Sequence, residues 1–271
     1  MSAVRSTDDK KSAKNVIQVR ADDELLERLM VFSERLHVPV SSLVRSWIID
    51  RLDTEISKEA VRCKAWQNDR LDQLKTSCAG APCQILHLLP LTPELSLMPE
   101  NISLFRGFLN PASGAQEFDE RINLLGFKTQ SLSSSAYVQV FNTGQIESVR
   151  YFAPEQQSIN GHIADDDLVK AITSYCKAYQ HLKLPLPVLV CVSYLGLAGI
   201  RINQHSRVFE DQFFCIQDKL VSNWEEVQSD EVTAKTIKPL IDQFWNAAGL
   251  PKSGTYSEDG LTWFGALASL L

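Results

Sequence analysis

The sequence predicts an α+β protein in two parts, a small N-terminal segment and a larger C-terminal domain. Three observations carry this prediction: apolar residues at helical spacing over 25–52, apolar and alternating strand-like runs after residue 84, and a Gly/Pro break (SCAGAP) at 77–82. We expect four regions, namely a basic flexible arm over 1–14, a strand and two helices over 15–52, a helical stalk and linker over 53–83, and a mixed α+β domain over 84–271.

The composition is that of a globular protein, and its charge is unevenly distributed. The chain has 271 residues, 44% hydrophobic and 22% charged, with a net charge of -6, which excludes collagenous and wholly disordered classes. Residues 1–75 carry a net +1 and the remainder -7, and the first 20 residues hold five basic and two acidic side chains. A basic N-terminal module within an acidic chain is therefore compatible with nucleic-acid binding.

The cysteines and histidines are scattered. None of the six cysteines and five histidines has the paired spacing of a structural zinc site, so we expect no metal and no cofactor. The most apolar stretch, 184–200, contains two prolines and is short for a membrane span. The first 15 residues are polar, unlike a secretory signal. These features predict a cytoplasmic protein without a membrane partner.

The N-terminal segment begins with a β-prone run and continues with two amphipathic helices. In the run NVIQVR (15–20), Val16, Gln18 and Arg20 share one face of a strand. Asp22-Asp23-Glu24 then provides an N-cap and first-turn acids. The first helix has an apolar face of Leu25, Leu29, Phe32 and Leu36. After His37-Val38-Pro39-Val40 the second runs through Leu43, Val44, Trp47, Ile48 and Leu52 and can extend to Ile56.

This segment is too small to fold alone. A lone strand leaves both edges unpaired, and two helices with one short strand bury too little apolar surface. Pairing the strand with a copy of itself across a two-fold axis solves both problems. We therefore expect an intertwined homodimer through residues 15–52.

The pattern VIQVRADDELLERLMVFSERLHVPVSSLVRSWIIDRL resembles the ribbon-helix-helix family of DNA-binding proteins, from which it departs at His37, where the family usually has glycine. The resemblance implies double-stranded DNA as a partner, read in the major groove by a two-stranded ribbon. Gln18 and Arg20 suit adenine and guanine, and Val16 suits a thymine methyl. The implied phosphate contacts are the backbone amides of Val40, Ser41 and Ser42 and the side chains of Lys10, Lys11, Lys14 and Arg45.

The C-terminal part alternates strand and helix patterns. We expect a strand at 84–91, a hairpin at 135–152, a helix at 164–182, strands near 186–193, 199–203 and 209–218, and a helix at 237–248. The stretches at 85–91, 136–147 and 239–260 resemble the region that follows a Schlafen-type, AlbA-like DNA-binding domain in bacterial proteins. This resemblance names no ligand, so a small-molecule effector and a protein partner both stay open.

Catalytic signals are weak in the C-terminal part. His87 lies in an apolar strand and reads as a core histidine, and Asp165, Asp166 and Asp167 read as a charge cluster at a helix start. The chain contains neither a P-loop nor a nucleophile elbow. We therefore predict a bacterial, dimeric transcriptional regulator rather than an enzyme. The main alternative is an interaction or antitoxin-type component whose N-terminal module only dimerises. A third alternative is an enzyme, which converging carboxylates in a cleft around His87 would favour.

Overall fold

In the computed structural model the chain divides into two compact units, Met1–Glu55 and Ile56–Leu271, and each is described by itself. The predicted basic arm and residues 15–19 of the strand predicted at 15–20 lie outside the described residues, so the ribbon stays a prediction. The structure describes residues 20–77, 81–91, 96–104, 106–110, 117–133, 136–152, 158–184, 186–203, 213–228 and 236–257.

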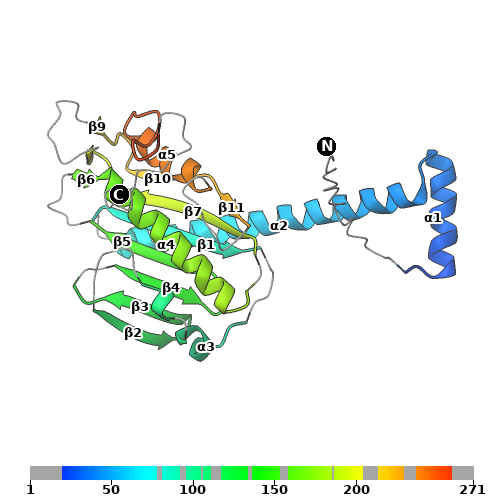
Figure 1. The fold of residues 1–271 in the computed structure, drawn as a ribbon, viewed down its shortest axis with the longest axis horizontal. Helices are drawn as coiled ribbons and strands as arrows, with labels where there is room; N and C mark the ends of the chain where they lie inside the picture. The colour runs from blue at the N-terminus through cyan, green and yellow to red at the C-terminus, as the bar shows by residue number, and fades with distance from the viewer. Residues whose placement is uncertain are drawn as a thin grey trace, which may run out of the picture. The chain divides into compact units, whose positions relative to one another are not determined.

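Two helices account for the first unit and for the start of the second. Helix α1 spans Asp23–Leu36, as the sequence predicted, and α2 spans Val40–Ser77 (Figure 1). No glycine or proline occurs between residues 40 and 77, so nothing in the sequence stops α2 where the second helix was expected to end. The predicted second helix and the predicted stalk are therefore one continuous helix, and the boundary between units falls within it rather than at 77–82.

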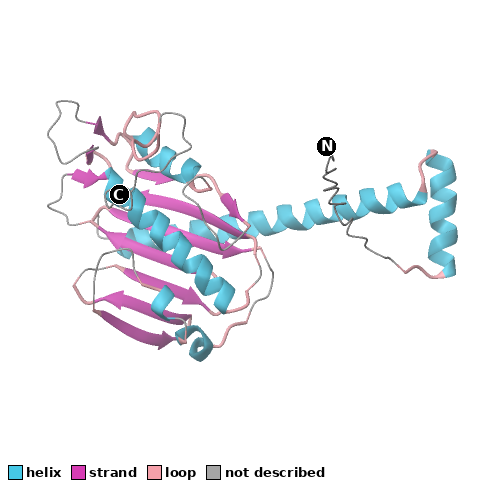
Figure 2. Ribbon diagram, viewed as in Figure 1, coloured by secondary structure: helices cyan, strands magenta, loops and turns pink. Residues whose placement is uncertain are grey.

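An eight-stranded antiparallel sheet forms the second unit, confirming the α+β class (Figure 2). The strand order is β10-β7-β1-β5-β4-β3-β2, and β11 also pairs with β7. Its strands are β1 (Cys83–Pro90), β2 (Phe118–Asn123), β3 (Gly126–Ser131), β4 (Tyr137–Phe141), β5 (Ile146–Tyr151), β7 (Val188–Leu195), β10 (Lys219–Val221) and β11 (Glu225–Val227). A smaller sheet joins β6 (Ser158–Asn160), β8 (Arg201–Asn203) and β9 (Phe213–Phe214).

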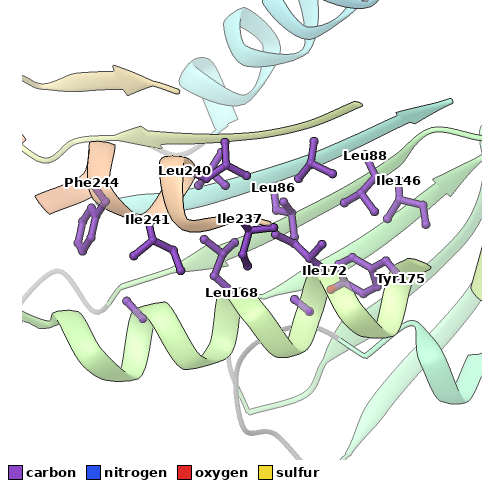
Figure 3. Packing of buried hydrophobic residues seen from close by; sticks show 14 of the residues in the cluster. Leu86, Leu88, Ile146, Leu168, Ile172, Tyr175, Ile237, Leu240, Ile241 and Phe244 are labelled. Atoms are coloured by element: carbon purple, nitrogen blue, oxygen red, sulfur yellow. The ribbon is translucent and has the colours of Figure 1, made fainter. Parts of the chain in front are cut away.

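One face of the large sheet is covered by α4 (Gly161–His181) and α5 (Lys238–Ala247). Figure 3 shows Leu86 and Leu88 of β1 pointing toward α4, where they meet Leu168, Ile172 and Tyr175. Ile237, Leu240, Ile241 and Phe244 extend this core toward α5. The short helices α3 (Pro99–Ser103) and η1 (Arg106–Phe108) complete the unit, α3 against β2 and β3 and η1 against α4.

The other face of the sheet is covered by the second part of α2. Leu71 and Leu74 pack against Cys83, Ile85, Val149 and Leu195, side chains that alternate with those facing α4. Cys63 and Gln67 of the same helix are buried too. Together with Leu71 and Leu74 they follow one another at steps of four, four and three residues, so all four lie on one face of the helix. The sequence interpretation of 53–77 as a solvated stalk was therefore wrong for this face of the helix.

The start of α4 also corrects a prediction. The helix begins at Gly161, with Asn160 as the N-cap accepting a bond from the Ile163 amide, and not at residue 164. Asp165, Asp166 and Asp167 therefore lie beyond the first turn, and Asp165 is buried. The strand at 84–91, the hairpin at 135–152 and the helix at 237–248 are confirmed to within three residues at each end.

Candidate functional site

The start of α1 has the cap that the sequence indicated. Asp22 is extended, and its Oδ1 accepts a hydrogen bond of 2.8 Å from the Leu25 amide. Asp23 and Glu24 follow in the first turn, where the helix dipole favours negative charge. Arg20, one of the three predicted base-reading residues, lies exposed just before this cap. The other two, Val16 and Gln18, lie outside the described residues, as do Lys10, Lys11 and Lys14.

The turn between α1 and α2 is set by His37 in a left-handed conformation, with φ 53° and ψ 36°. The His37 amide donates to the Glu34 carbonyl and the Val38 amide donates to the Ser33 carbonyl, which is the Schellman pattern. The Ser33 hydroxyl also donates to the Val38 carbonyl at 2.7 Å. These bonds hold a non-glycine residue in a backbone region that most residues avoid.

The start of α2 contains four predicted phosphate contacts. Val40, Ser41 and Ser42 lie in its first turn and Arg45 lies in the second, and the first turn contains no acidic residue that would repel an anion. The Ser42 amide already donates to the Pro39 carbonyl at 2.9 Å. The amides of Val40 and Ser41, without a carbonyl partner in the described part of the chain, are therefore the two donors that this helix start presents.

The first unit leaves most of its large apolar side chains exposed. Among its described residues, 20–55, only Leu29 and Leu43 are buried, and Phe32 meets Trp47 edge to face at 6.2 Å between ring centroids. A surface this apolar is unusual for a monomeric protein. The side chains between 40% and 60% exposed are Leu25, Leu26, Met30, Val31, Phe32, Leu36, Trp47, Ile48, Ile49 and Leu52.

The second unit contains a buried ionic cluster between α2 and the sheet. Glu147 of β5 accepts two hydrogen bonds from Arg70 of α2, at 2.7 and 2.9 Å, and one of 2.9 Å from the Tyr137 hydroxyl. His87 Nε2 lies 3.2 Å from the same carboxylate, and the His87 and Glu147 side chains are fully buried. Because an ionised carboxylate only accepts, Nε2 carries the hydrogen.

The partners of Glu147 keep it ionised. Burial raises the pKa of this carboxyl, but the hydrogen bonds from His87 and Arg70 outweigh burial and hold the pKa at about 2. The bond to Glu147 in turn raises the pKa of Arg70, and burial raises the pKa of Tyr137. The cluster is therefore a bidentate Arg–Glu pair with two further donors, an arrangement that makes a buried charge tolerable.

His87 is thus a buried core histidine, as predicted, but its setting is ionic rather than apolar. Sequence reasoning missed Glu147 and Arg70, although the strand registers place His87 directly opposite Glu147 once β1 and β5 pair. No signal in the local sequence marked that pairing. A catalytic role requires access for a substrate, and the His87 and Glu147 side chains are closed to solvent.

A second buried carboxylate, Asp165, lies between α4 and α5. Its Oδ2 accepts hydrogen bonds from the Trp245 indole at 2.9 Å, the Ser253 hydroxyl at 2.6 Å and the Thr255 hydroxyl at 2.9 Å. His162 Nδ1 lies 2.6 Å from the same Thr255 hydroxyl. Burial raises the pKa of Asp165 to about 7 against the effect of these donors. The cluster fastens the segment after α5 to α4.

Comparison with known proteins gave no match to a family model, to a curated protein sequence or to a solved structure. Among the described residues, no group of three or more His, Cys, Asp or Glu side chains is placed to hold a metal ion. None of the described helices is long and apolar enough to cross a membrane. The described part of the first unit, with its exposed apolar side chains and a helix start without acidic residues, is the candidate functional site.

Proposed function

We propose that this protein is a dimeric, sequence-specific DNA-binding protein that regulates transcription in a bacterial cytoplasm. Residues 15–52 form the dimer and read the major groove. The observation that carries the proposal is the exposed apolar surface of α1 and the first part of α2, because a helical hairpin with two buried leucines needs a partner to be stable. A second copy of the chain provides that partner by symmetry.

Three features of the same unit support DNA as the ligand. The first turn of α2 offers the Val40 and Ser41 amides and contains no acidic residue, an arrangement that favours a phosphate. Arg20 is exposed at the edge of the predicted ribbon. The basic side chains of Lys10, Lys11 and Lys14 precede it in the sequence and suit contacts to the DNA backbone.

Selection of bound fragments from random double-stranded DNA by the full-length protein tests this proposal. We expect an enriched site with two related half-sites. Arg20→Ala and Gln18→Ala are each expected to weaken binding to that site by roughly 10- to 100-fold and to relax the sequence preference at one position, because each removes a bidentate base contact. Affinity should also fall steeply with added salt.

Arg121→Ala is the matched control, because Arg121 is an exposed arginine of β2 in the second unit, 75% accessible, and its loss removes the same charge. It should leave DNA binding unchanged. A protein that is dimeric but selects no sequence and shifts no DNA at low salt would contradict the proposal and leave a dimerisation module, as in an antitoxin-type component. Whether or not the protein binds DNA, the large domain is the candidate binder of a protein or small-molecule partner.

A further inference from the structure

An apolar stripe continues along α2 beyond the residues assigned to the DNA-binding segment. Ile48, Leu52 and Ile56 follow one another at steps of four residues and are 40%, 56% and 52% exposed. They share one face of the helix, with Arg45 before them and Glu59 after them. A helix with such a partly exposed apolar face is stable in water when a second helix packs on it.

We infer that α2 pairs with α2 of a second copy in antiparallel orientation, centred on Leu52. This inference rests on the homodimer of the proposed function and extends its interface to Glu59. Centring the two-fold axis on Leu52 places Leu52 against its own copy and Ile48 against Ile56 of the partner subunit. The same register places Arg45 against Glu59 of the partner subunit, and Glu59 against the partner's Arg45.

The charges on the stripe select this orientation. In a parallel pair each residue meets its own copy, so Arg45 meets arginine and Glu59 meets glutamate, two repulsive contacts. In the antiparallel pair the same residues form two attractive contacts at the ends of the apolar centre. Glu59 already bonds Arg62 of its own helix through Oε2, at 2.6 and 2.7 Å, and a carboxylate accommodates a further donor. Arg45 pairs with no carboxylate among the described residues.

The pairing changes the role of Arg45. Sequence reasoning assigned it to a phosphate, whereas the antiparallel register places it in the dimer interface. Its charge then contributes to association of the free protein, measurable without DNA.

Cysteine cross-linking of the full-length protein tests the register. In the antiparallel pair, Ile48 of one chain lies about 12 Å along the axis from its own copy, too far for a disulfide, but directly beside Ile56 of the partner subunit. Ile48→Cys and Ile56→Cys are therefore expected to cross-link when coexpressed, one with a size tag, and not when expressed alone. The described native cysteines are buried, and the untreated chain reports any background from the rest. Cross-linking of each single variant with itself would overturn the antiparallel register.

Charge reversal gives an independent test by sedimentation. Arg45→Glu and Glu59→Arg are each expected to raise the dimer dissociation constant about tenfold, and the double variant is expected to restore it. Leu52→Glu should make the chain largely monomeric, whereas Val61→Glu, about two and a half turns along α2 on the opposite face, should not. A dimer that is unaffected by Leu52→Glu and by both charge reversals would refute the antiparallel α2 pairing but not the dimer of residues 15–52. A monomeric wild-type chain would refute both the pairing and that dimer.

Discussion

At the scale of single residues, Glu147 makes the ionic cluster a source of stability at neutral pH. Its pKa of about 2 in the folded chain lies below the ordinary value of 4.5, so its contribution is complete above pH 4.5 and is lost as the pH falls through 2. The shift corresponds to about 3 kcal/mol. Glu147→Gln removes the ionic partner of Arg70, a half-buried guanidinium that keeps its bond to Gln73, and should lower the free energy of unfolding at neutral pH by about 3 kcal/mol.

Denaturant titrations of the wild type and of Glu147→Gln across the acid range check this prediction. The matched control is Glu120→Gln, which removes a carboxylate from the exposed pair with Arg106 at 3.4 Å. That pair should contribute at most about 1 kcal/mol. Equal losses from the two variants would show that the buried cluster has no special contribution.

Asp165 has the opposite pH dependence. Its pKa of about 7 lies above the ordinary value of 3.8, so the folded state favours the neutral acid. The associated stability is complete below pH 3.8 and is lost as the pH rises through 7. We expect the free energy of unfolding of the wild type to fall by as much as about 4 kcal/mol over this window relative to Asp165→Asn, which cannot ionise. Parallel profiles for the two proteins between pH 4 and 7 would contradict the assignment.

At the scale of elements, the turn after α1 offers a direct test of backbone strain. His37 holds φ at 53°, a region that glycine enters without a side-chain penalty. His37→Gly should therefore stabilise α1 by roughly 0.5–1 kcal/mol, and His37→Ala should not. Hydrogen exchange of the α1 amides measures the difference, since the last turn of the helix frays when the cap weakens. Faster exchange in His37→Gly would mean that the imidazole itself stabilises the turn.

Element prediction succeeded where a local rule decides and failed where a partner decides. The positions of three features followed from the sequence, because neighbouring residues alone determine each of them. They are the N-cap at Asp22, the apolar face of α1 and the Asn142–Gln145 turn of the hairpin. The face of α2 that carries Cys63, Gln67 and Leu71 is buried because a sheet formed later in the chain covers it. The mixed polar and apolar spacing of residues 53–77 reads equally well as a solvated helix, and only tertiary packing distinguishes the two.

The same limit applies to the candidate sites. The start of α2, which holds the predicted phosphate contacts, was predictable to within two residues, because a serine pair after a proline marks a helix start. The Glu147 and Asp165 clusters were not predictable, because Arg70 donates to Glu147 from a helix 77 residues away and Ser253 donates to Asp165 from a loop 88 residues away. The position of Asp165 was also mispredicted. Asn160 caps α4, so the helix begins at Gly161, and the three aspartates do not form its first turn.

At the scale of the whole molecule, the two units should differ in what stabilises them. The second unit buries a large core of its own on both faces of its sheet. In the described part of the first unit, residues 20–55, two leucines are buried and ten large apolar side chains are between 40% and 60% exposed. If a second copy covers those side chains, folding of the first unit is coupled to association.

We expect thermal unfolding in two steps when the helix signal is monitored by far-ultraviolet circular dichroism. The midpoint of the first step should rise with protein concentration while that of the second stays constant. In Leu52→Glu the first step should occur at lower temperature and lose its concentration dependence. A first step that is independent of concentration in the wild type would mean that the helical hairpin is stable without a partner, which its burial does not explain.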